Sequence, residues 1–167
     1  MKNLVIGQSG GPTAVINASL YGAVKAFKES GTDGHVLGMI NGIEGFLADH
    51  VMDLSTDLSD EELELLKLTP AAYLSSCRYK LPADLESEVY PAIFDNFREM
   101  NIGYFLYVGG NDSMDTVDKL SRYAEKIGSD VKFIGIPKTI DNDLVLTDHT
   151  PGFGSAAKYV ASTVREI

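Results

Sequence analysis

Short apolar runs alternate with helical patterns along this chain, and this alternation restricts the possible folds more than any other feature. Strands that alternate with helices are joined by right-handed crossovers, which produce a mostly parallel sheet covered by helices on both faces. We therefore predict an α/β fold. The expected strands cover residues 3–7, 35–40, 104–108 and 133–136. Two expected helices begin near residues 12 and 59, and three more cover residues 87–100, 114–127 and 156–167.

Composition limits the setting in which such a domain works. A length of 167 residues fits one domain with a real core, and the hydrophobic content of 44% is ordinary for a soluble protein. The net charge of −10, from 24 acidic against 14 basic side chains, disfavours nucleic acid and anionic lipid as partners. The single cysteine, Cys77, allows no internal disulfide, and no apolar run approaches the ~20 residues of a membrane span. We expect a cytoplasmic protein.

Two of the expected strands run into a pair of glycines followed by a helix. The first junction is Gln8-Ser9-Gly10-Gly11-Pro12-Thr13, and the second is Gly109-Gly110-Asn111-Asp112-Ser113. A helix start directs free backbone N–H groups and the positive end of the helix dipole at an anion, so both junctions are candidate phosphate sites. The alternative is that the glycines only make tight turns. Pro12 suits the first turn of its helix, and Asp112 is the expected N-cap of the second helix.

The loop after the last strand concentrates the chemically active side chains. Pro137 ends the strand, and Lys138, Thr139, Asp141 and Asp143 follow within six residues. Ligands of open parallel sheets bind just beyond the carboxyl ends of the strands, so this loop is a candidate active site. The alternative is a turn in which aspartate and asparagine side chains bond their own backbone.

Local predictions follow for the remaining segments. Arg78 and Lys80 are two cations on a loop, which are either solvated or in contact with a ligand. Residues 41–46 are predicted to be a loop with turns at both glycines, and Ser59 is predicted to cap a short helix. The last helix stops at Ile167 without a glycine, proline or polar cap, so we expect a piece of a longer chain.

Glycine-lined backbone, a lysine and carboxylates together suit phosphoryl transfer. This chemistry needs positioning, charge neutralisation and one base that accepts a proton from the attacking hydroxyl. Asp141 is the expected base, and Lys138 is the expected counter-charge for the transferring group. Three histidines and one cysteine in no cluster make a zinc site improbable, whereas Mg²⁺ held by carboxylates and phosphate oxygens is compatible.

At these residues the sequence resembles the phosphofructokinase family. The resemblance rests on Pro-Lys-Thr-Ile-Asp-Asn-Asp at 137–143 and Thr-Asp-His-Thr-Pro-Gly-Phe at 147–153. The segments 10–12 through 17–18, 76–80 and 109–113 also fall in the family's order and spacing. The resemblance covers essentially all 167 residues. It implies a Rossmann-like amino-terminal domain over residues 1–167, which binds the phosphoryl donor and is truncated before the sugar-phosphate-binding domain.

The resemblance implies a glycolytic transferase that phosphorylates the 1-hydroxyl of fructose 6-phosphate. Asp141 matches the proton-abstracting aspartate, and Thr139 and Asp143 match its neighbours around the sugar and the transferring phosphate. Lys138 completes the implied catalytic group. The implied donor-phosphate residues are Gly11, Arg78, Lys80, Gly110, Asp112 and Ser113.

Two of these positions imply which donor is used. Asp112 stands where ATP-using members have glycine, and Lys138 replaces a glycine that is common in the ATP enzymes. A carboxylate would crowd and repel the inner phosphate and ribose of a nucleotide but leave room for a diphosphate. The implied donor is pyrophosphate, with an ATP-dependent enzyme as the alternative.

The resemblance is incomplete in two respects. Asn111 replaces the aspartate that holds magnesium in many members, so Asn111 and Asp112 are the candidate metal ligands and Mg²⁺ is expected to arrive mainly with the diphosphate. Much of the family's sugar-phosphate site, including a Met-Gly-Arg motif and residues of neighbouring subunits, is not in this chain. We therefore expect a homo-oligomer at full length and a fragment that turns over poorly or not at all when alone. The alternative from another class is a non-catalytic phosphate- or nucleotide-binding module.

Overall fold

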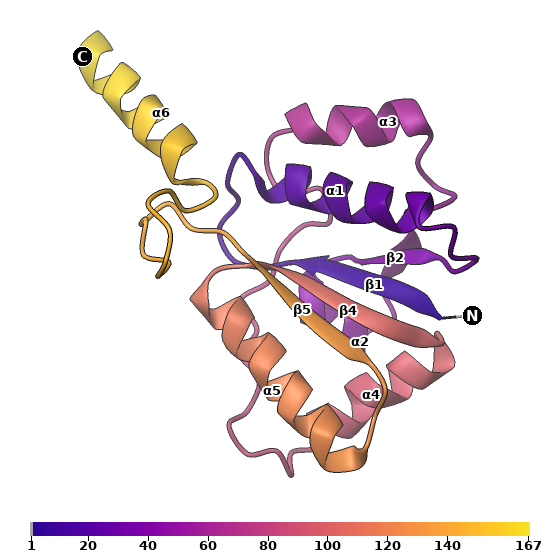
Figure 1. Ribbon diagram of the computed structural model, residues 1–167. Coiled ribbons are helices and arrows are strands. Elements are labelled where there is room, and N and C mark those ends of the chain that lie inside the picture. Colours follow the sequence, from indigo (N-terminus) through magenta and orange to yellow (C-terminus); the bar gives the residue numbers. More distant parts are fainter. Residues whose placement is uncertain (1) are drawn as a thin grey trace.

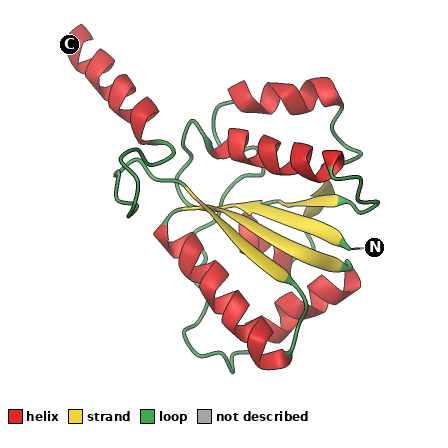
Figure 2. Cartoon of the chain, viewed as in Figure 1, coloured by secondary structure: helices red, strands yellow, loops and turns green. Residues whose placement is uncertain are grey.

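The computed structural model describes residues 2–167 as a five-stranded sheet between two layers of helices (Figure 1). The strand order is β3-β2-β1-β4-β5, and every pairing is parallel except that of β2 with β3. The predicted mostly parallel α/β fold is confirmed. The strands, drawn as yellow arrows in Figure 2, are β1 (Asn3–Gln8), β2 (Val36–Met39), β3 (Val51–Asp53), β4 (Ile102–Gly109) and β5 (Lys132–Pro137).

Helices cover both faces of this sheet, as predicted. In Figure 1, α1 and α3 lie over one face, and α2, α4 and α5 lie over the other. None of the helices in the described part of the chain is long and apolar enough to cross a membrane. The helices are α1 (Ile16–Glu29), α2 (Gly42–Leu47), α3 (Asp60–Leu65) with the 3₁₀ turn η1 (Leu66–Leu68), α4 (Val89–Glu99), α5 (Asn111–Ile127) and α6 (Phe153–Glu166).

The central strands divide their side chains between two cores, because successive residues of a strand point to opposite faces. On β1, Leu4 and Ile6 join the core beneath α1 and α3, whereas Val5 joins the core beneath α2, α4 and α5. On β4, Phe105 and Leu106 are divided in the same way. Burial on both faces explains why these strands are continuous apolar runs.

Two elements next to β2 differ from the predictions. Residues 41–46 were expected to form a loop, but they include most of α2, and the short antiparallel edge strand β3 was not predicted. Asn41 and Gly42 have φ of 60° and 57°, which turns the chain before α2 begins. Ile43 and Phe46 then face the core at helical spacing and are fully buried.

Three further predictions concern the boundaries and environment of elements. Asp112 was expected to be an N-cap, but Gly110 caps α5, because its carbonyl accepts from Ser113 N and Met114 N at 3.0 Å each. The helix expected to open at Pro12 begins later, at Ile16. The strand predicted over residues 133–136 is present within β5, but its predicted burial was wrong, because β5 is an edge strand with Ile134 51% exposed.

The predicted cap of α3 is confirmed. Ser59 caps α3 in a full capping box, with its hydroxyl accepting from Glu62 N while the Glu62 carboxylate accepts from Ser59 N. The last predicted helix is α6, which begins three residues earlier than expected. None of its residues is buried, and Figure 1 shows it projecting away from the sheet.

Candidate active site

The carboxyl ends of β1, β4 and β5 lie side by side, and the loops that follow them enclose one cavity. The register fixes this arrangement, since Gly7 pairs with Tyr107 and Gly109 pairs with Pro137. The cavity has a volume of about 330 Å³ and is lined by Gly11, Pro12, Thr13, Arg78, Gly110, Asn111, Lys138, Thr139, Ile140 and Asp141. Both glycine junctions and the 137–143 loop therefore face the same space.

Glycine keeps the walls of this cavity clear at two points. A Cβ added at Gly11 would meet no atom within 4 Å, and one added at Gly110 would meet only the Lys138 carbonyl, at 3.7 Å. Protein packing therefore does not explain the absence of a side chain at Gly11. Gly10, next to it, has φ of 74°, a backbone conformation that favours glycine. These features suit a backbone surface that a phosphate group could approach closely.

Lys138 is the most buried charged group of the site. Its residue is 5% exposed, its N–H donates to the Gly109 carbonyl at 2.9 Å, and its ammonium donates to the Gly11 carbonyl across the cavity. Burial lowers the pKa of Lys138 from its ordinary value of 10.5, and the neighbouring positive charge of Arg78 lowers it further. Two cations therefore share one small space, an arrangement that an anion would stabilise.

The 137–143 loop combines the two alternatives that the sequence left open. Asn142 makes the turn, since its φ is 54° and its side chain bonds Asp148 O at 3.2 Å and Thr150 N at 2.9 Å. Asp141 instead lines the cavity, while its N–H donates to the Thr139 hydroxyl at 3.0 Å. Thr139 N is bonded in turn to Pro151 O at 3.0 Å. The turn thus presents one exposed carboxylate to the cavity.

Four of the predicted site residues lie outside the lining of this cavity. Lys80 and Asp112 form an ion pair of 3.1 Å with side chains that are 69% and 71% exposed. Ser113 is buried and packs on Gly109, where an added Cβ would lie 1.9 Å from the Ser113 hydroxyl oxygen. That contact gives Ser113 a packing role. Asp143 accepts a hydrogen bond of 3.4 Å from the Asn111 amide.

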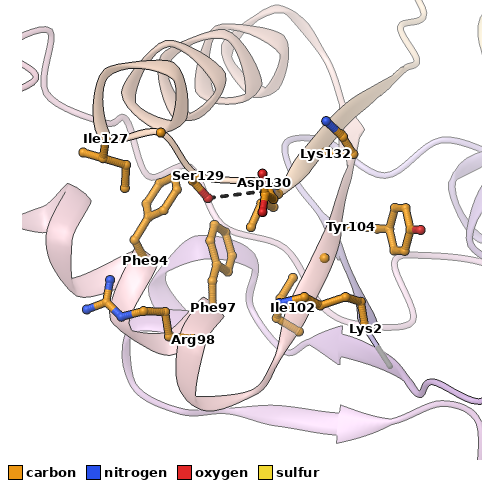
Figure 3. A pocket seen from close by; sticks show the side chains of 13 residues that line it. Lys2, Phe94, Phe97, Arg98, Ile102, Tyr104, Ile127, Ser129, Asp130 and Lys132 are labelled. Atoms are coloured by element: carbon orange, nitrogen blue, oxygen red, sulfur yellow. Dashed lines mark hydrogen bonds between the residues drawn. The ribbon is translucent and has the colours of Figure 1, made fainter.

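A second cavity, of about 430 Å³, lies at the opposite end of the sheet, where β4 and β5 begin (Figure 3). Phe94, Phe97 and Ile102 form its apolar wall, and Lys2, Arg98 and Lys132 surround it. It contains none of the predicted site residues. Ligands of open α/β sheets bind at the other, carboxyl ends of the strands, so the cavity beside Asp141 is the candidate active site.

Comparison with known proteins agrees with this geometry. The sequence model of the family described as "Phosphofructokinase" matches residues 3–167. The chain belongs to the phosphofructokinase family. A protein of Halomonas elongata named pyrophosphate--fructose 6-phosphate 1-phosphotransferase is 46% identical over 167 residues, which cover 98% of this chain and 39% of that protein. A Methylococcus capsulatus protein of the same name is 44% identical, over 99% of this chain and 40% of its own length.

A solved structure of a phosphofructokinase supports the same assignment. The pyrophosphate-dependent phosphofructokinase of Nitrosospira multiformis superposes with a TM-score of 0.91 at 42% identity, covering 99% of this chain and 40% of that one. The phosphofructokinase fold is therefore shown over nearly the whole chain. The chain spans about two fifths of the length of these relatives.

Sequence reasoning about this phosphofructokinase-family chain missed some residues of the site. Pro12, Thr13 and Ile140 also line the cavity, and the Thr13 hydroxyl is buried with no hydrogen-bond partner among the described residues. The position of Thr13, directly after Gly10-Gly11-Pro12, was the available signal. Two buried amides that bond each other, Gln8 and Asn17, were also missed, because the sequence gives no sign of what a buried amide bonds.

Within residues 2–167 the phosphofructokinase site contains no cluster of three or more histidine, cysteine, aspartate or glutamate side chains able to hold a metal ion. The oxygens nearest to such a role are those of Asp141 and Asn111 in the cavity and of Asp143 beside Asn111. Mg²⁺ is commonly held by one or two carboxylates together with substrate phosphates and water. This donor set fits an ion that arrives bound to the donor better than an ion resident in the protein.

Proposed function

We propose that this chain is the donor-side part of an enzyme that transfers a phosphoryl group from pyrophosphate to the 1-hydroxyl of fructose 6-phosphate in glycolysis. The products are fructose 1,6-bisphosphate and orthophosphate. One observation carries the proposal: Gly11, Arg78, Lys138 and Asp141, which come from the loops after β1 and β5 and from the loop that ends at Arg78, line a single cavity. The names of the relatives with 46% and 44% identity point to the same reaction.

Each residue has a distinct task in the proposed reaction. Asp141 accepts the proton as the sugar hydroxyl attacks phosphorus. Lys138 and Arg78 offset the charge of the transferring group and of the departing orthophosphate. The backbone at Gly11 and Gly110 lets the diphosphate approach without meeting a side chain. Thr139 holds the turn that directs Asp141, since it accepts from Asp141 N.

Mg²⁺ is the proposed metal, and it arrives with the diphosphate. When bound, it neutralises charge on the phosphate oxygens. Asn111 and Asp141, which line the cavity, and Asp143, which accepts from the Asn111 amide at 3.4 Å, are the groups of this chain that would approach it. Asp112, the other metal candidate from the sequence, is held by Lys80 and has the less suitable position.

Pyrophosphate is preferred over ATP as the donor for a physical reason. Lys138 fills space between the β1 and β5 loops, and Asp112 with Lys80 stands beside the α5 start, just outside the cavity. A nucleotide would have to extend past these groups, whereas a diphosphate fits between the two glycine loops.

The setting of the enzyme is also a proposal. We place it in the cytoplasm, as a homo-oligomer in which residues 1–167 form the amino-terminal donor domain and other residues supply the sugar-phosphate contacts. The share of the relatives' length that the chain covers, 39% and 40%, supports this division.

Asp141→Asn separates the enzyme from a non-catalytic phosphate-binding module. In the enzyme that also carries the sugar-phosphate site, we expect turnover to fall about 10²–10⁴-fold, as for loss of a general base, with pyrophosphate affinity nearly unchanged. Asp130→Asn, at the opposite end of the sheet, is the matched control and should keep full activity. Turnover that survives Asp141→Asn would sink the catalytic assignment, and a wild-type protein that binds pyrophosphate without turnover would favour the binding module.

A further inference from the structure

The site depends on a segment with an unusual backbone, residues 69–78, which carries Arg78 to the cavity. Within it, Ala71 and Ser75 have φ of 65° and 59°. A left-handed conformation is unfavourable for a residue with a side chain, so a segment with two such residues needs strong bonds to its surroundings. It lies next to the end of β1, where Ser9 and Cys77 form a parallel bridge.

Two buried side chains supply bonds that the segment needs. Asn17, 1% exposed in the first turn of α1, donates to Thr69 O and Ala71 O at 2.8 Å each and accepts from Tyr73 N at 2.9 Å. Gln8, fully buried at the end of β1, accepts from Leu74 N at 2.8 Å. Four backbone groups between residues 69 and 74 are therefore bonded to these two amides.

The two amides also bond each other and the helix start. The Gln8 side chain donates to Asn17 Oδ1 at 2.9 Å and to Ile16 O at 3.2 Å. Every amide hydrogen of the pair thus has an acceptor, and each oxygen accepts from a backbone N–H. The partners fix which way each amide points, because carbonyls can only accept and N–H groups can only donate. Such a fully satisfied buried network rigidifies its surroundings.

The segment then contacts the glycine loop itself. Gly10 N donates to Cys77 O at 3.2 Å, and the Ser76 hydroxyl donates to Gly10 O at 2.6 Å. Gly11 and Arg78, which both line the cavity, are the next residues along the two segments. A shift of the 69–78 segment would therefore move Arg78 relative to Gly11.

We propose that Gln8 and Asn17 are positioning residues for the phosphoryl donor, which act with Ser76 to hold Arg78 opposite Gly11. They touch no donor atom and act through the 69–78 segment. This inference rests on the proposed function, because it assumes that Gly11 and Arg78 bind one pyrophosphate.

Asn17→Asp tests the role of the pair with little change of shape. The new oxygen faces the Thr69 and Ala71 carbonyls in place of two N–H donors, so the segment must move. We expect pyrophosphate affinity, measured by isothermal titration, to fall about 10–100-fold, as for a catalytic group displaced by about 1 Å. In the enzyme with its sugar-phosphate site, the KM for pyrophosphate should rise while that for fructose 6-phosphate stays unchanged.

Asn96→Asp is the matched control. The Asn96 amide donates to Phe46 O at 2.7 Å from α4, beneath the other face of the sheet. Both variants should lose stability, but Asn96→Asp should keep its pyrophosphate affinity. Ser76→Ala, which leaves the buried pair intact, should weaken pyrophosphate binding about fivefold for the loss of one hydrogen bond, and it serves if Asn17→Asp does not fold.

The possible outcomes are distinct. If Asn17→Asp folds and binds pyrophosphate as tightly as the wild type, the positioning role is overturned and the proposed function is not. If Asn17→Asp does not fold, wild-type pyrophosphate affinity in Ser76→Ala has the same meaning. An equal loss in Asn96→Asp would show a general stability effect and would also overturn the inference. Failure of the wild type to bind pyrophosphate would overturn the proposed function and the inference with it.

Discussion

The Lys138 ammonium is buried, lies near the positive charge of Arg78 and donates to the Gly11 carbonyl. An incoming anion would compete with that carbonyl for the ammonium. Its pKa lies below 10.5 because burial, and then Arg78, disfavour the charged form. The charged form therefore costs folding stability below the lowered pKa, and that cost declines as the pH rises from the lowered pKa to the ordinary value of 10.5. Charge on Lys138 has the opposite effect on donor binding: it strengthens the binding of a diphosphate, and the bound diphosphate stabilises the charged form.

The pH dependence of pyrophosphate affinity should therefore report Lys138. We expect the affinity to fall as the pH rises through the lowered pKa, before an ordinary lysine would lose its proton at about 10.4. Isothermal titration between about pH 7 and pH 10 measures it. Lys138→Met should bind more weakly and lack this decline, while pyrophosphate's own titration is common to both proteins. Parallel affinity profiles for the two proteins would contradict the prediction.

Asp112 and Lys138 are expected to set the preference of the enzyme for pyrophosphate over ATP. In the enzyme with its sugar-phosphate site, Asp112→Gly with Lys138→Gly should cut pyrophosphate-dependent activity and relieve the block to ATP. The reason is that the double change removes a carboxylate and a cation from the space that a nucleotide would need. The ratio of kcat/KM for the two donors measures the effect, and Asp118→Gly with Lys132→Gly provides the same charge changes on other surfaces. A ratio unchanged by the site variant would support the ATP-dependent alternative.

At the scale of single elements, the sequence predicted strands and long helices well because their signal is local. Leu4, Val5 and Ile6 are apolar because they face the two cores. Any parallel strand that is buried on both faces gives a similar continuous apolar run in the sequence. In contrast, α2 depends on the turn at Asn41 and Gly42, and on Gly45, where an added Cβ would meet the Ile40 carbonyl at 1.5 Å. Such close backbone approaches are tertiary, so the sequence indicated only a glycine-rich loop.

The capping box of α3 provides a stability prediction at this scale. Ser59→Ala removes the acceptor for Glu62 N and should lower the free energy of unfolding by about 1 kcal/mol. Urea denaturation measures the change, and pyrophosphate affinity should stay constant because neither Ser59 nor any residue of α3 lines the cavity. Ser162→Ala, at an exposed position inside α6, is the control and should change stability by less than about 0.5 kcal/mol. Equal losses for the two serines would mean that the capping bond contributes nothing.

At the scale of the whole molecule, the sequence could predict that the site loops meet at one edge of the sheet. It could not predict which side chains of those loops point into the cavity. Parallel strands end at one edge, so the two glycine junctions and the Asp141 loop were expected to face one ligand. Gly11, Gly110 and Asp141 line one cavity, whereas Asp112 lies outside its lining. The inward position of Lys138 and the outward position of Lys80 do not follow from residue type, since both are lysines on loops. Which lysine is buried depends on the neighbours that the fold brings to it, here the Gly11 carbonyl for Lys138 and Asp112 for Lys80.

Helix α6 projects away from the sheet (Figure 1). It has no buried residue, and Tyr159, Val160 and Val164 are 72%, 57% and 67% exposed on one side of the helix. An isolated helix of ~12–15 residues is marginal in water, so α6 needs a second surface to stay helical. We expect the 167-residue chain to associate through this face. The backbone amides of α6 should therefore be protected from hydrogen exchange at high protein concentration and exchange freely at low concentration.

Val160→Glu with Val164→Glu tests that expectation, because two carboxylates on the apolar side oppose its burial. The variant should sediment as a smaller species, lose the concentration-dependent protection of α6 and keep its pyrophosphate affinity, since the cavity residues are unchanged. Ser155→Glu with Ser162→Glu adds the same charge to α6 without removing apolar surface, and it should still associate. Protection of α6 that is equally strong at the lowest measurable concentration would show that the helix needs no partner surface, and the exposed valines would then have no role in assembly.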